Sequence, residues 1–260
     1  FFGLSILAAG MNPAEGFLFA LGMIVAFVPE GMLPTVTLSL AMGVQRMARR
    51  KALVKRLSAV ETLGCTSVIC TDKTGTLTQN EMTVREVWTP GGRLEVTGAG
   101  YDTSGSVLRG GKALTAKEEP DLGELLVAGA LCNNARLIPP REGYAGWSAL
   151  GDPTEAALRV LAAKGGVDAE DAAARAPRRR EIPFDSRRKR MVTVHKEGDG
   201  WAVFVKGAPV EVSRLCTRIR RDGTDHPFTE EERARAAEAN DAMARSGLRV
   251  LAVASRRMTE

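Results

Sequence analysis

The sequence contains few histidines and cysteines. It has two histidines and four cysteines (Cys65, Cys70, Cys132 and Cys216), with no Cys-x-x-Cys pair and no nearby histidine cluster. A zinc site needs closely spaced thiolate or imidazole ligands, and a disulfide framework is typical of small secreted domains. We therefore expect neither, and we expect the cysteines to be reduced cytosolic thiols.

Charge is missing from a long stretch near the start. The thirty residues of Gly16–Gln45 carry one charged side chain, Glu30. About twenty apolar residues suffice to cross a bilayer, so this stretch is long enough to span one. Pro29, Gly31 and Pro34 surround the acid, and because proline removes a backbone donor we expect the helix to be unwound near its middle.

Six basic residues and no acid follow this stretch: Arg46, Arg49, Arg50, Lys51, Lys55 and Arg56. Such an excess marks the cytosolic side of a membrane segment. We therefore expect an integral membrane protein, in the plasma membrane of a bacterium, with the residues after about Arg46 in the cytosol. The alternative is a buried core helix of a soluble protein. The net charge of +5 comes from clustered Arg and Lys, and we expect no nucleic-acid partner.

The first residue is Phe1, and no basic leader precedes the opening apolar run Phe1–Met11. A signal peptide is therefore not expected. We expect instead that the sequence is a piece of a longer chain.

After Asn80, short apolar runs alternate with helical patterns. The runs predict strands at Met82–Thr89, Arg93–Thr97, Met191–His195, Trp201–Lys206 and Leu248–Ala254. Helices are predicted at Asp121–Leu131, Pro153–Lys164 and Glu230–Arg245, of which the last two follow the capping residues Asp152 and Thr229. We expect Gly165–Arg180 to be a surface excursion and Gly198-Asp199-Gly200 to be a hairpin turn.

The most specific motif is Asp72-Lys73-Thr74-Gly75-Thr76-Leu77-Thr78. The β-prone run Thr66–Thr71 predicts a strand that delivers Asp72 to a loop, as open α/β sheets do at their active sites. A carboxylate can capture a phosphoryl group covalently. Gly75 lets the loop approach phosphate, and Lys73 offers positive charge.

This motif resembles the phosphorylation signature of P-type ATPases. The resemblance implies an aspartyl phosphate on Asp72, with Lys73 and Thr74 in the same loop and Mg²⁺ held by Asp72, Thr74 and further carboxylates. In phosphatases of the same fold family, a second aspartate usually occupies the position of Thr74. Without that acid–base group the aspartyl phosphate should persist, as a pump requires.

Glu30 lies in the apolar stretch, where a carboxylate indicates an ion site. A helix break there frees the carbonyls of Val25, Ala26 and Val28 to act as hard oxygen ligands beside it. The run resembles the Pro-Glu-Gly motif in the fourth transmembrane helix of type II pumps, such as calcium and sodium/potassium pumps. The resemblance implies a transported cation, whose identity the sequence leaves open. The alternative is that Glu30 lies at the membrane interface.

An aromatic residue followed by cations indicates a nucleotide site. Phe184 precedes Arg187, Arg188 and Lys189, which offers a face for adenine and charge for phosphates. Lys206 ends a predicted strand, so its ammonium can project into the same pocket. The alternatives are that Phe184 lies in the core and that the cations form a solvated face.

In this order the segments resemble the nucleotide-binding domain of the same family. The resemblance implies that Phe184 stacks on adenine and that three residues line the pocket: Lys189, Lys206 and Gly207. It further implies contacts of Thr154 and Glu155 with the nucleotide and of Arg249 with its phosphates. The alternative is that Glu155 is the acid of a capping box. Val210 stands where the family usually has Glu, so the resemblance implies no contact of this side chain at that helix start.

The resemblance covers essentially the whole chain and implies a multidomain fold. We expect transmembrane helices (1–45, the end of a third and a broken fourth), a cytosolic stalk (46–64), the start of a Rossmann-like haloacid-dehalogenase-type phosphorylation domain (65–80) and an inserted α+β nucleotide-binding domain with an antiparallel sheet (81–260).

The function expected from these motifs is ATP-driven cation transport, with ATP as substrate, Mg²⁺ as cofactor and the lipid bilayer as surroundings. The isolated segment should not turn over, because the family's actuator loop and later phosphorylation motifs do not occur in it. Two alternatives are open: a soluble haloacid-dehalogenase-type phosphatase, which Thr74 and the apolar stretch oppose, and a non-catalytic nucleotide-binding membrane protein in which Asp72 is a relic.

Overall fold

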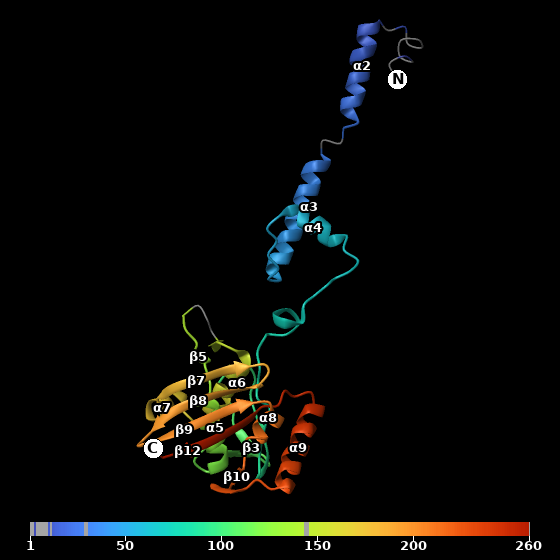
Figure 1. The fold of residues 1–260 in the computed structure, drawn as a ribbon. Helices are drawn as coiled ribbons and strands as arrows, with labels where there is room; N and C mark the ends of the chain where they lie inside the picture. Colours follow the sequence, from blue (N-terminus) through green and yellow to red (C-terminus); the bar gives the residue numbers. More distant parts are fainter. Residues whose placement is uncertain (1–2, 4–9, 11, 29–30, 143–145, 260) are drawn as a thin grey trace. The chain divides into compact units, whose positions relative to one another are not determined.

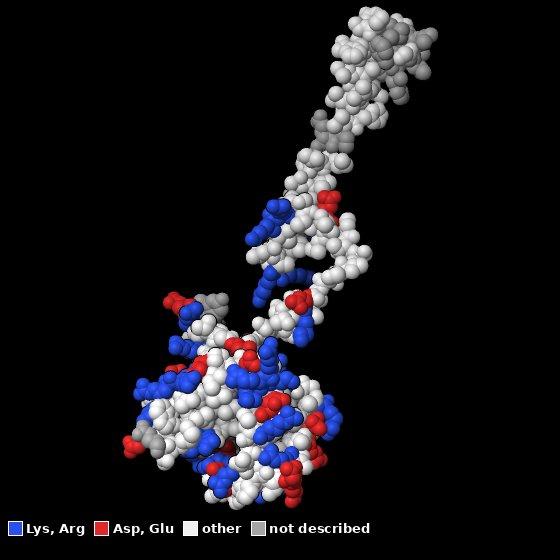
Figure 2. Space-filling model, viewed as in Figure 1, with Lys and Arg blue, Asp and Glu red and all other residues white. Residues whose placement is uncertain are grey.

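The computed structural model describes residues 3, 10, 12–28, 31–142 and 146–259. The chain divides into two compact units, Phe1–Asp72 and Lys73–Glu260 (Figure 1). Figure 2 shows the contrast in charge, because Lys, Arg, Asp and Glu cover the visible face of the second unit and are sparse along the N-terminal helices.

The first unit is helical. Its helices are α2 (Pro13–Ala26), α3 (Met32–Arg49) and α4 (Leu57–Gly64). Asn12 caps α2, since its side-chain oxygen accepts a hydrogen bond from the amide of Glu15 at 3.0 Å. Two arginines lie in the last turn of α3, where the helix dipole favours cations.

The apolar stretch is divided between two helices. α2 ends at Ala26 and α3 begins at Met32, on either side of Pro29 and Glu30, which lie outside the described residues. Within the described parts of the chain, no helix is long and apolar enough to cross a membrane. With 14 residues, α2 is about 21 Å long, which is less than the roughly 30 Å of a hydrocarbon core.

The strand expected at residues 66–71 is absent, and this prediction was wrong for the structure described. The segment has no regular secondary structure, and Val68 and Ile69 are 74% and 83% exposed. A strand is stabilised by main-chain hydrogen bonds to a neighbour. Among the described residues no strand pairs with this segment, so its β propensity alone does not form a strand.

The second unit is built on antiparallel sheets. Its main sheet has the order β12-β9-β8-β7 and the bounds β7 Arg178–Asp185, β8 Arg190–Glu197, β9 Gly200–Gly207 and β12 Ala252–Met258. β8 and β9 pair from Arg190 opposite Gly207 to Glu197 opposite Gly200. Gly198 and Asp199 form the turn between them, so the turn predicted here is confirmed, as is the antiparallel sheet.

Within the described residues, three further sheets contain the other strands. The four-stranded one contains β1 (Glu86–Thr89), β2 (Gly92–Val96), β3 (Val107–Arg109) and β4 (Lys112–Leu114). The two hairpins are β5 (Arg136–Ile138) with β6 (Ser148–Leu150) and β10 (Arg218–Arg221) with β11 (Thr224–Pro227).

The helices of the second unit begin at capping residues or prolines. They are α5 (Pro120–Leu131), α6 (Pro153–Lys164), α7 (Ala169–Arg175), α8 (Pro209–Ser213) and α9 (Glu230–Arg245). The Asp152 carboxylate accepts hydrogen bonds from the amides of Thr154 and Glu155 at 2.8 and 3.3 Å, which fixes the start of α6. The bounds predicted for α6 and α9 are confirmed.

α5 lies between two apolar clusters. Leu122 and Leu126 pack with side chains of β1, β2, β3 and α6. Further along the same helix, Ala128 and Leu131 pack with Phe204 of β9 and with Ala172 of α7. A helix that is apolar on most of its surface belongs in the middle of a domain, and α5 joins the smaller sheet to the main one.

The segment Gly165–Arg180 is part of this core, so the expected surface excursion was wrong. It contains α7 and the start of β7, and Ala172 and Ala176 are buried in the second cluster. Alanine side chains are short, which lets α7 pack closely against α5. The Ala- and Arg-rich composition suggested exposure, but the alanines of this segment form a buried face.

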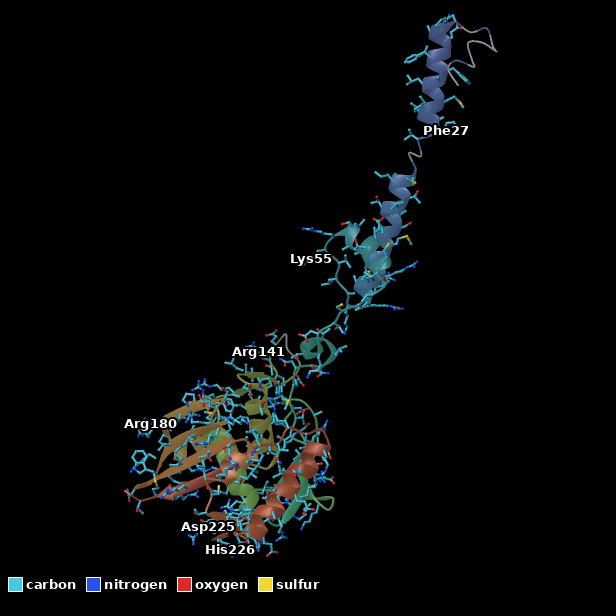
Figure 3. All side chains as sticks on the ribbon, turned by 45° about the vertical axis from the view of Figure 1, so that its right-hand side comes forward. Phe27, Lys55, Arg141, Arg180, Asp225 and His226 are labelled. Carbon is cyan, nitrogen blue, oxygen red and sulfur yellow. The ribbon has the colours of Figure 1, made fainter. Side chains whose placement is uncertain are left out.

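Asp121 ties the start of α5 to the β10–β11 hairpin, whose strand β11 carries Asp225 and His226 (Figure 3). Its buried carboxylate accepts hydrogen bonds from the amides of Asp222 and Gly223 at 2.8 and 3.0 Å. Both turn residues have positive φ, 51° and 75°, as a two-residue hairpin turn requires.

Asp121→Ala should lower the free energy of unfolding by about 2 kcal/mol, because two amides lose a charged acceptor. Urea unfolding followed by circular dichroism measures this loss. Asp225→Ala is the matched control, since its carboxylate forms an exposed pair with Arg220 at 3.2 Å and should change stability by at most about 0.5 kcal/mol. Equal urea midpoints for the two variants would contradict this stabilising role of Asp121.

Candidate functional site

A buried ion pair lies between α6 and the end of β9. The Lys206 ammonium donates to Glu155 Oε1 at 2.5 Å, and the two side chains are only 9% and 15% exposed. Lys206 points inward because β9 alternates, with Ala202 and Phe204 on the same buried side. A charge removed from water needs a partner of opposite charge, and here Lys206 and Glu155 are each other's partners.

Two consecutive asparagines hold Glu155 from outside its own helix. The amide of Asn134 donates to Glu155 Oε2 at 2.7 Å, so both carboxylate oxygens have donors. The side chain of Asn133, which is fully buried, donates to the Glu155 main-chain oxygen at 2.8 Å. The Glu155 carboxylate is therefore fixed toward Lys206 and the Asn134 main chain.

Thr154 and Arg249 come together at the start of α6. The Arg249 guanidinium donates to Thr154 Oγ1 at 3.3 Å, although the two residues are far apart in the chain. This contact places a cation on Thr154, the residue that precedes Glu155 in α6. A helix N-terminus with nearby cations is an environment that favours anions.

Gly207 brings the β7–β8 hairpin against the end of β9. A Cβ at this position would lie 2.3 Å from the main-chain oxygen of Lys189, so only glycine fits. The same oxygen accepts from the amide of Ala208 at 2.9 Å. Lys189 itself is exposed and lies in a turn with φ of +50°. Its contacts with Gly207 and Ala208 fix its main chain close to Lys206.

Phe184 lies near the end of β7 and is 63% exposed. The alternative that it belongs to the core is therefore wrong. A large exposed ring on a hairpin beside cations offers a free aromatic face.

Cys132 is buried next to Lys206 but does not neutralise it. Burial raises the pKa of the Cys132 thiol, despite the nearby Lys206 ammonium, so the thiol stays protonated. It donates to the Met191 main-chain oxygen at 3.7 Å. Glu155 is accordingly the anion that pairs with Lys206.

The segment predicted to take up phosphate, residues 72–78, spans the boundary between the two units. Asp72 is exposed at the end of the first unit, and Lys73–Leu77 forms one irregular helical turn, η1, at the start of the second. Gly75 has φ of +72°, which glycine adopts without strain. The amide of Thr78 donates to the Lys73 main-chain oxygen at 3.1 Å and closes the turn. Asp72 and the Lys206–Glu155 pair therefore belong to different units.

The residues expected to bind a transported cation lie at the end of α2. Val25 and Ala26 are in its last turn, and the main-chain oxygen of Val25 accepts a hydrogen bond from Val28 at 3.0 Å. Glu30 lies outside the described residues.

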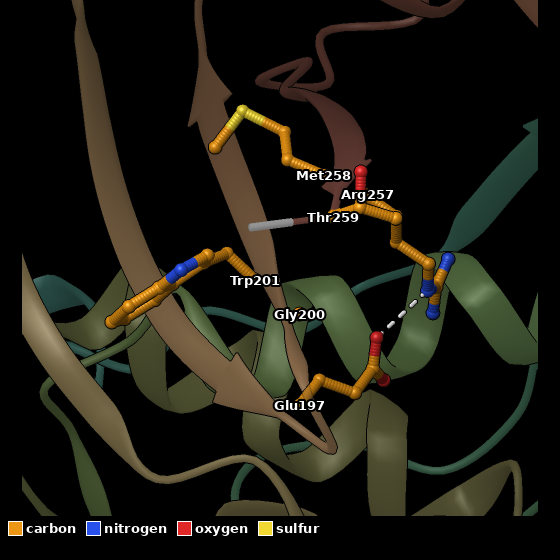
Figure 4. A pocket seen from close by; sticks show the side chains of 6 residues that line it. All are labelled: Glu197, Gly200, Trp201, Arg257, Met258 and Thr259. Atoms are coloured by element: carbon orange, nitrogen blue, oxygen red, sulfur yellow. Dashed lines mark hydrogen bonds and ion pairs between the residues drawn. The ribbon is translucent and has the colours of Figure 1, made fainter.

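No three His, Cys, Asp or Glu side chains gather as a metal site within residues 12–28, 31–142 and 146–259. The Mg²⁺ site at Asp72 and Thr74 stays a prediction. A separate hollow of about 260 Å³ lies at the far end of the main sheet, between Trp201, Met258 and the Arg257–Glu197 pair (Figure 4). None of the predicted site residues lines it.

The residues that sequence reasoning missed are the partners of Glu155: Asn133 and Asn134, with Arg178 and Glu181 behind them. Two asparagines that begin two residues after the end of a predicted helix are a signal of local side-chain hydrogen bonding. Their link to α6 and β7 depends on long-range packing and is not visible in the sequence.

Comparison with known proteins gives a consistent result. The family described as "P-type ATPase, cytoplasmic domain N" matches residues 121–260. The chain is 42% identical over 253 residues to the probable cation-transporting ATPase F of Mycobacterium tuberculosis, covering 96% of the chain and 27% of that protein. It is 40% identical to the calcium-transporting ATPase of Bacillus subtilis (97% and 29%) and 39% identical to the human calcium-transporting ATPase type 2C member 1 (95% and 26%). The chain thus spans between 26% and 29% of these relatives.

Proposed function

The chain belongs to the P-type ATPase family, and from this we infer that it is part of a cation pump driven by ATP through an aspartyl phosphate on Asp72. The observation that carries the nucleotide-binding part of this proposal is the Lys206–Glu155 pair. Glu155 follows Thr154, which Arg249 contacts, and the residue after Lys206 packs against the β7–β8 hairpin that carries Phe184. Cations, a helix start and a free aromatic ring are the groups that a nucleotide needs.

In the proposed nucleotide site, adenine stacks on the exposed ring of Phe184. Lys189 and Lys206 line the pocket with positive charge, and Arg249 binds the phosphates. Thr154 contributes a hydroxyl, and Glu155 contacts the nucleotide while holding Lys206. Gly207 is required because the hairpin approaches β9 too closely for any side chain.

In the proposed phosphoryl transfer, a carboxylate oxygen of Asp72 attacks the γ-phosphorus of ATP. A bond from Asp72 to phosphorus forms, the bond from phosphorus to the β,γ-bridging oxygen breaks, and ADP leaves with that oxygen. Lys73 stabilises the charge on the transferred group. Thr74 provides no carboxylate to activate water, so the acyl phosphate persists.

Mg²⁺ is implied by the family, and the donors present suit it. Asp72 offers a carboxylate and Thr74 offers hydroxyl and main-chain oxygens, which are the hard ligands that this ion prefers. When bound, the ion neutralises phosphate charge. We propose that these residues form part of a haloacid-dehalogenase-type phosphorylation domain.

We further propose that the whole protein is an integral membrane pump, in the plasma membrane of a bacterium, with the residues after about Arg46 in the cytosol. Glu30 and the main-chain oxygens of Val25, Ala26 and Val28 would contribute to the site of the transported cation within the lipid bilayer. The similar proteins are named as cation- or calcium-transporting ATPases, which supports a cation as the cargo.

The purified 260-residue chain should bind ATP, and Phe184→Ala should raise the dissociation constant about tenfold, since stacking a base on an aromatic ring contributes about 1–3 kcal/mol. Isothermal titration calorimetry measures both. Trp201→Ala is the aromatic control, because Trp201 lines the hollow at the other end of the sheet and should not change affinity. No ATP binding by the unaltered chain, or equal affinities for Phe184→Ala and the unaltered chain, would overturn the assignment.

A further inference from the structure

Arg178, the first residue of β7, uses all four terminal N–H groups of its guanidinium. Nη1 donates to Asn134 Oδ1 at 2.5 Å and to Glu181 Oε2 at 2.8 Å. Nη2 donates to the main-chain oxygen of Leu131 at 3.1 Å and also to that of Asn133. A guanidinium has five donors in a fixed fork, so four of them are committed within the protein.

Two of these acceptors are carbonyls at the end of α5. Leu131 is the last residue of the helix, and Asn133 follows the capping residue. Helix ends leave such carbonyls without intrahelical partners, and a cation there also interacts favourably with the helix dipole. Arg178 therefore fixes where the chain leaves α5.

Asn134 carries this constraint to the ion pair. Its side-chain oxygen accepts from Arg178, and its side-chain nitrogen donates to Glu181 Oε1 at 2.9 Å. Both side-chain groups of Asn134 are thus bound. This fixes the residue so that its main-chain N–H points toward Glu155 Oε2. The other oxygen of Glu155 holds the Lys206 ammonium.

We propose that Arg178 is a positioning residue, which sets the Lys206–Glu155 pair for the nucleotide through Asn134. This inference rests on the proposed nucleotide-binding function of that pair. Arg178 is not assigned a contact with phosphate, because its terminal donors are occupied and Glu181 offsets its charge. It acts on the nucleotide only by fixing where Lys206 and Glu155 lie.

Arg257 provides a matched control for a structural arginine. Its guanidinium bridges three elements in the same unit, donating to both oxygens of Glu124 at 2.9 and 3.1 Å and to Glu197 at 2.9 Å. It borders the hollow at the far end of the sheet (Figure 4). Its loss should lower the unfolding midpoint and leave the nucleotide site unchanged.

The test compares ATP affinity in the 260-residue chain and in four variants: Arg178→Ala, Asn134→Ala, the double variant, and Arg257→Ala. Calorimetry at a temperature where all are folded should give a dissociation constant raised about tenfold for each of the first two. The double variant should bind ATP no more weakly than either single variant, because the effects of substitutions within one hydrogen-bond network do not add. Arg257→Ala should match the unaltered chain.

Hydrogen exchange adds a local readout, since the Asn134 amide should exchange faster in Arg178→Ala and not in Arg257→Ala. If Arg178→Ala does not fold, Asn134→Ala carries the test. Unchanged ATP affinity in Asn134→Ala and in any folded Arg178→Ala would overturn the positioning role alone. Absence of ATP binding by the unaltered chain would overturn the proposed function and this inference together.

Discussion

In the intact protein, Asp72→Asn should lower ATP hydrolysis by at least about 10³-fold, as expected when a covalent nucleophile is removed. The amide oxygen of asparagine is a poor nucleophile, so the acyl phosphate cannot form. Every later step depends on that intermediate. Phosphate release from membranes containing the full-length protein measures the effect.

Asp199→Asn is the control for this substitution. Asp199 lies with Gly198 in the turn between β8 and β9. Its side chain is exposed, so hydrolysis should stay at the unaltered rate. If Asp72→Asn kept more than about a tenth of the activity, Asp72 would not be the nucleophile.

Glu155→Ala should have the largest effect on stability, lowering the free energy of unfolding by about 3 kcal/mol. The substitution leaves the Lys206 ammonium without its anion in a site where that side chain is 9% exposed. Urea unfolding measures the loss. ATP affinity should fall as well, because Lys206 loses its fixed position.

Two further variants separate the ion pair from a general loss of packing. Asp171→Ala removes the partner of Arg175, at 3.0 Å, in a pair whose two side chains are both exposed, and should change stability by at most about 0.5 kcal/mol. Adding Lys206→Met to Glu155→Ala should recover much of the stability, because the unpaired buried charge is then removed. A double variant less stable than Glu155→Ala would argue against this explanation.

Elements with strong local signals were predictable. α6 and α9 have the expected bounds because capping residues and following glycines fix their ends. The turn at Gly198 and Asp199 was predictable because glycines flank Asp199 between two alternating runs. In these places the local preference of the chain agrees with its tertiary packing.

The failures have a common cause. Residues 66–71 have β propensity but no pairing partner among the described residues, and α7 hides a buried alanine face in a charged segment. Both outcomes depend on what lies across from the segment. Sequence periodicity does not carry that information.

The candidate site was predictable in its residues but not in its construction. Family resemblance indicated Lys206 and Glu155, and the structure pairs them at 2.5 Å. The network behind them joins Asn134 to Arg178 and Glu181, which lie 44 and 47 residues further along the chain. Such long-range hydrogen bonds depend on the fold.

The most direct test is to identify the phosphorylated residue in the intact protein after a short incubation with γ-labelled ATP and an acid quench. We predict a label that is stable in acid, released by hydroxylamine and located at Asp72 by peptide mass spectrometry. A label on a hydroxyl or imidazole side chain, or no label on a protein that hydrolyses ATP, would contradict an aspartyl-phosphate pump.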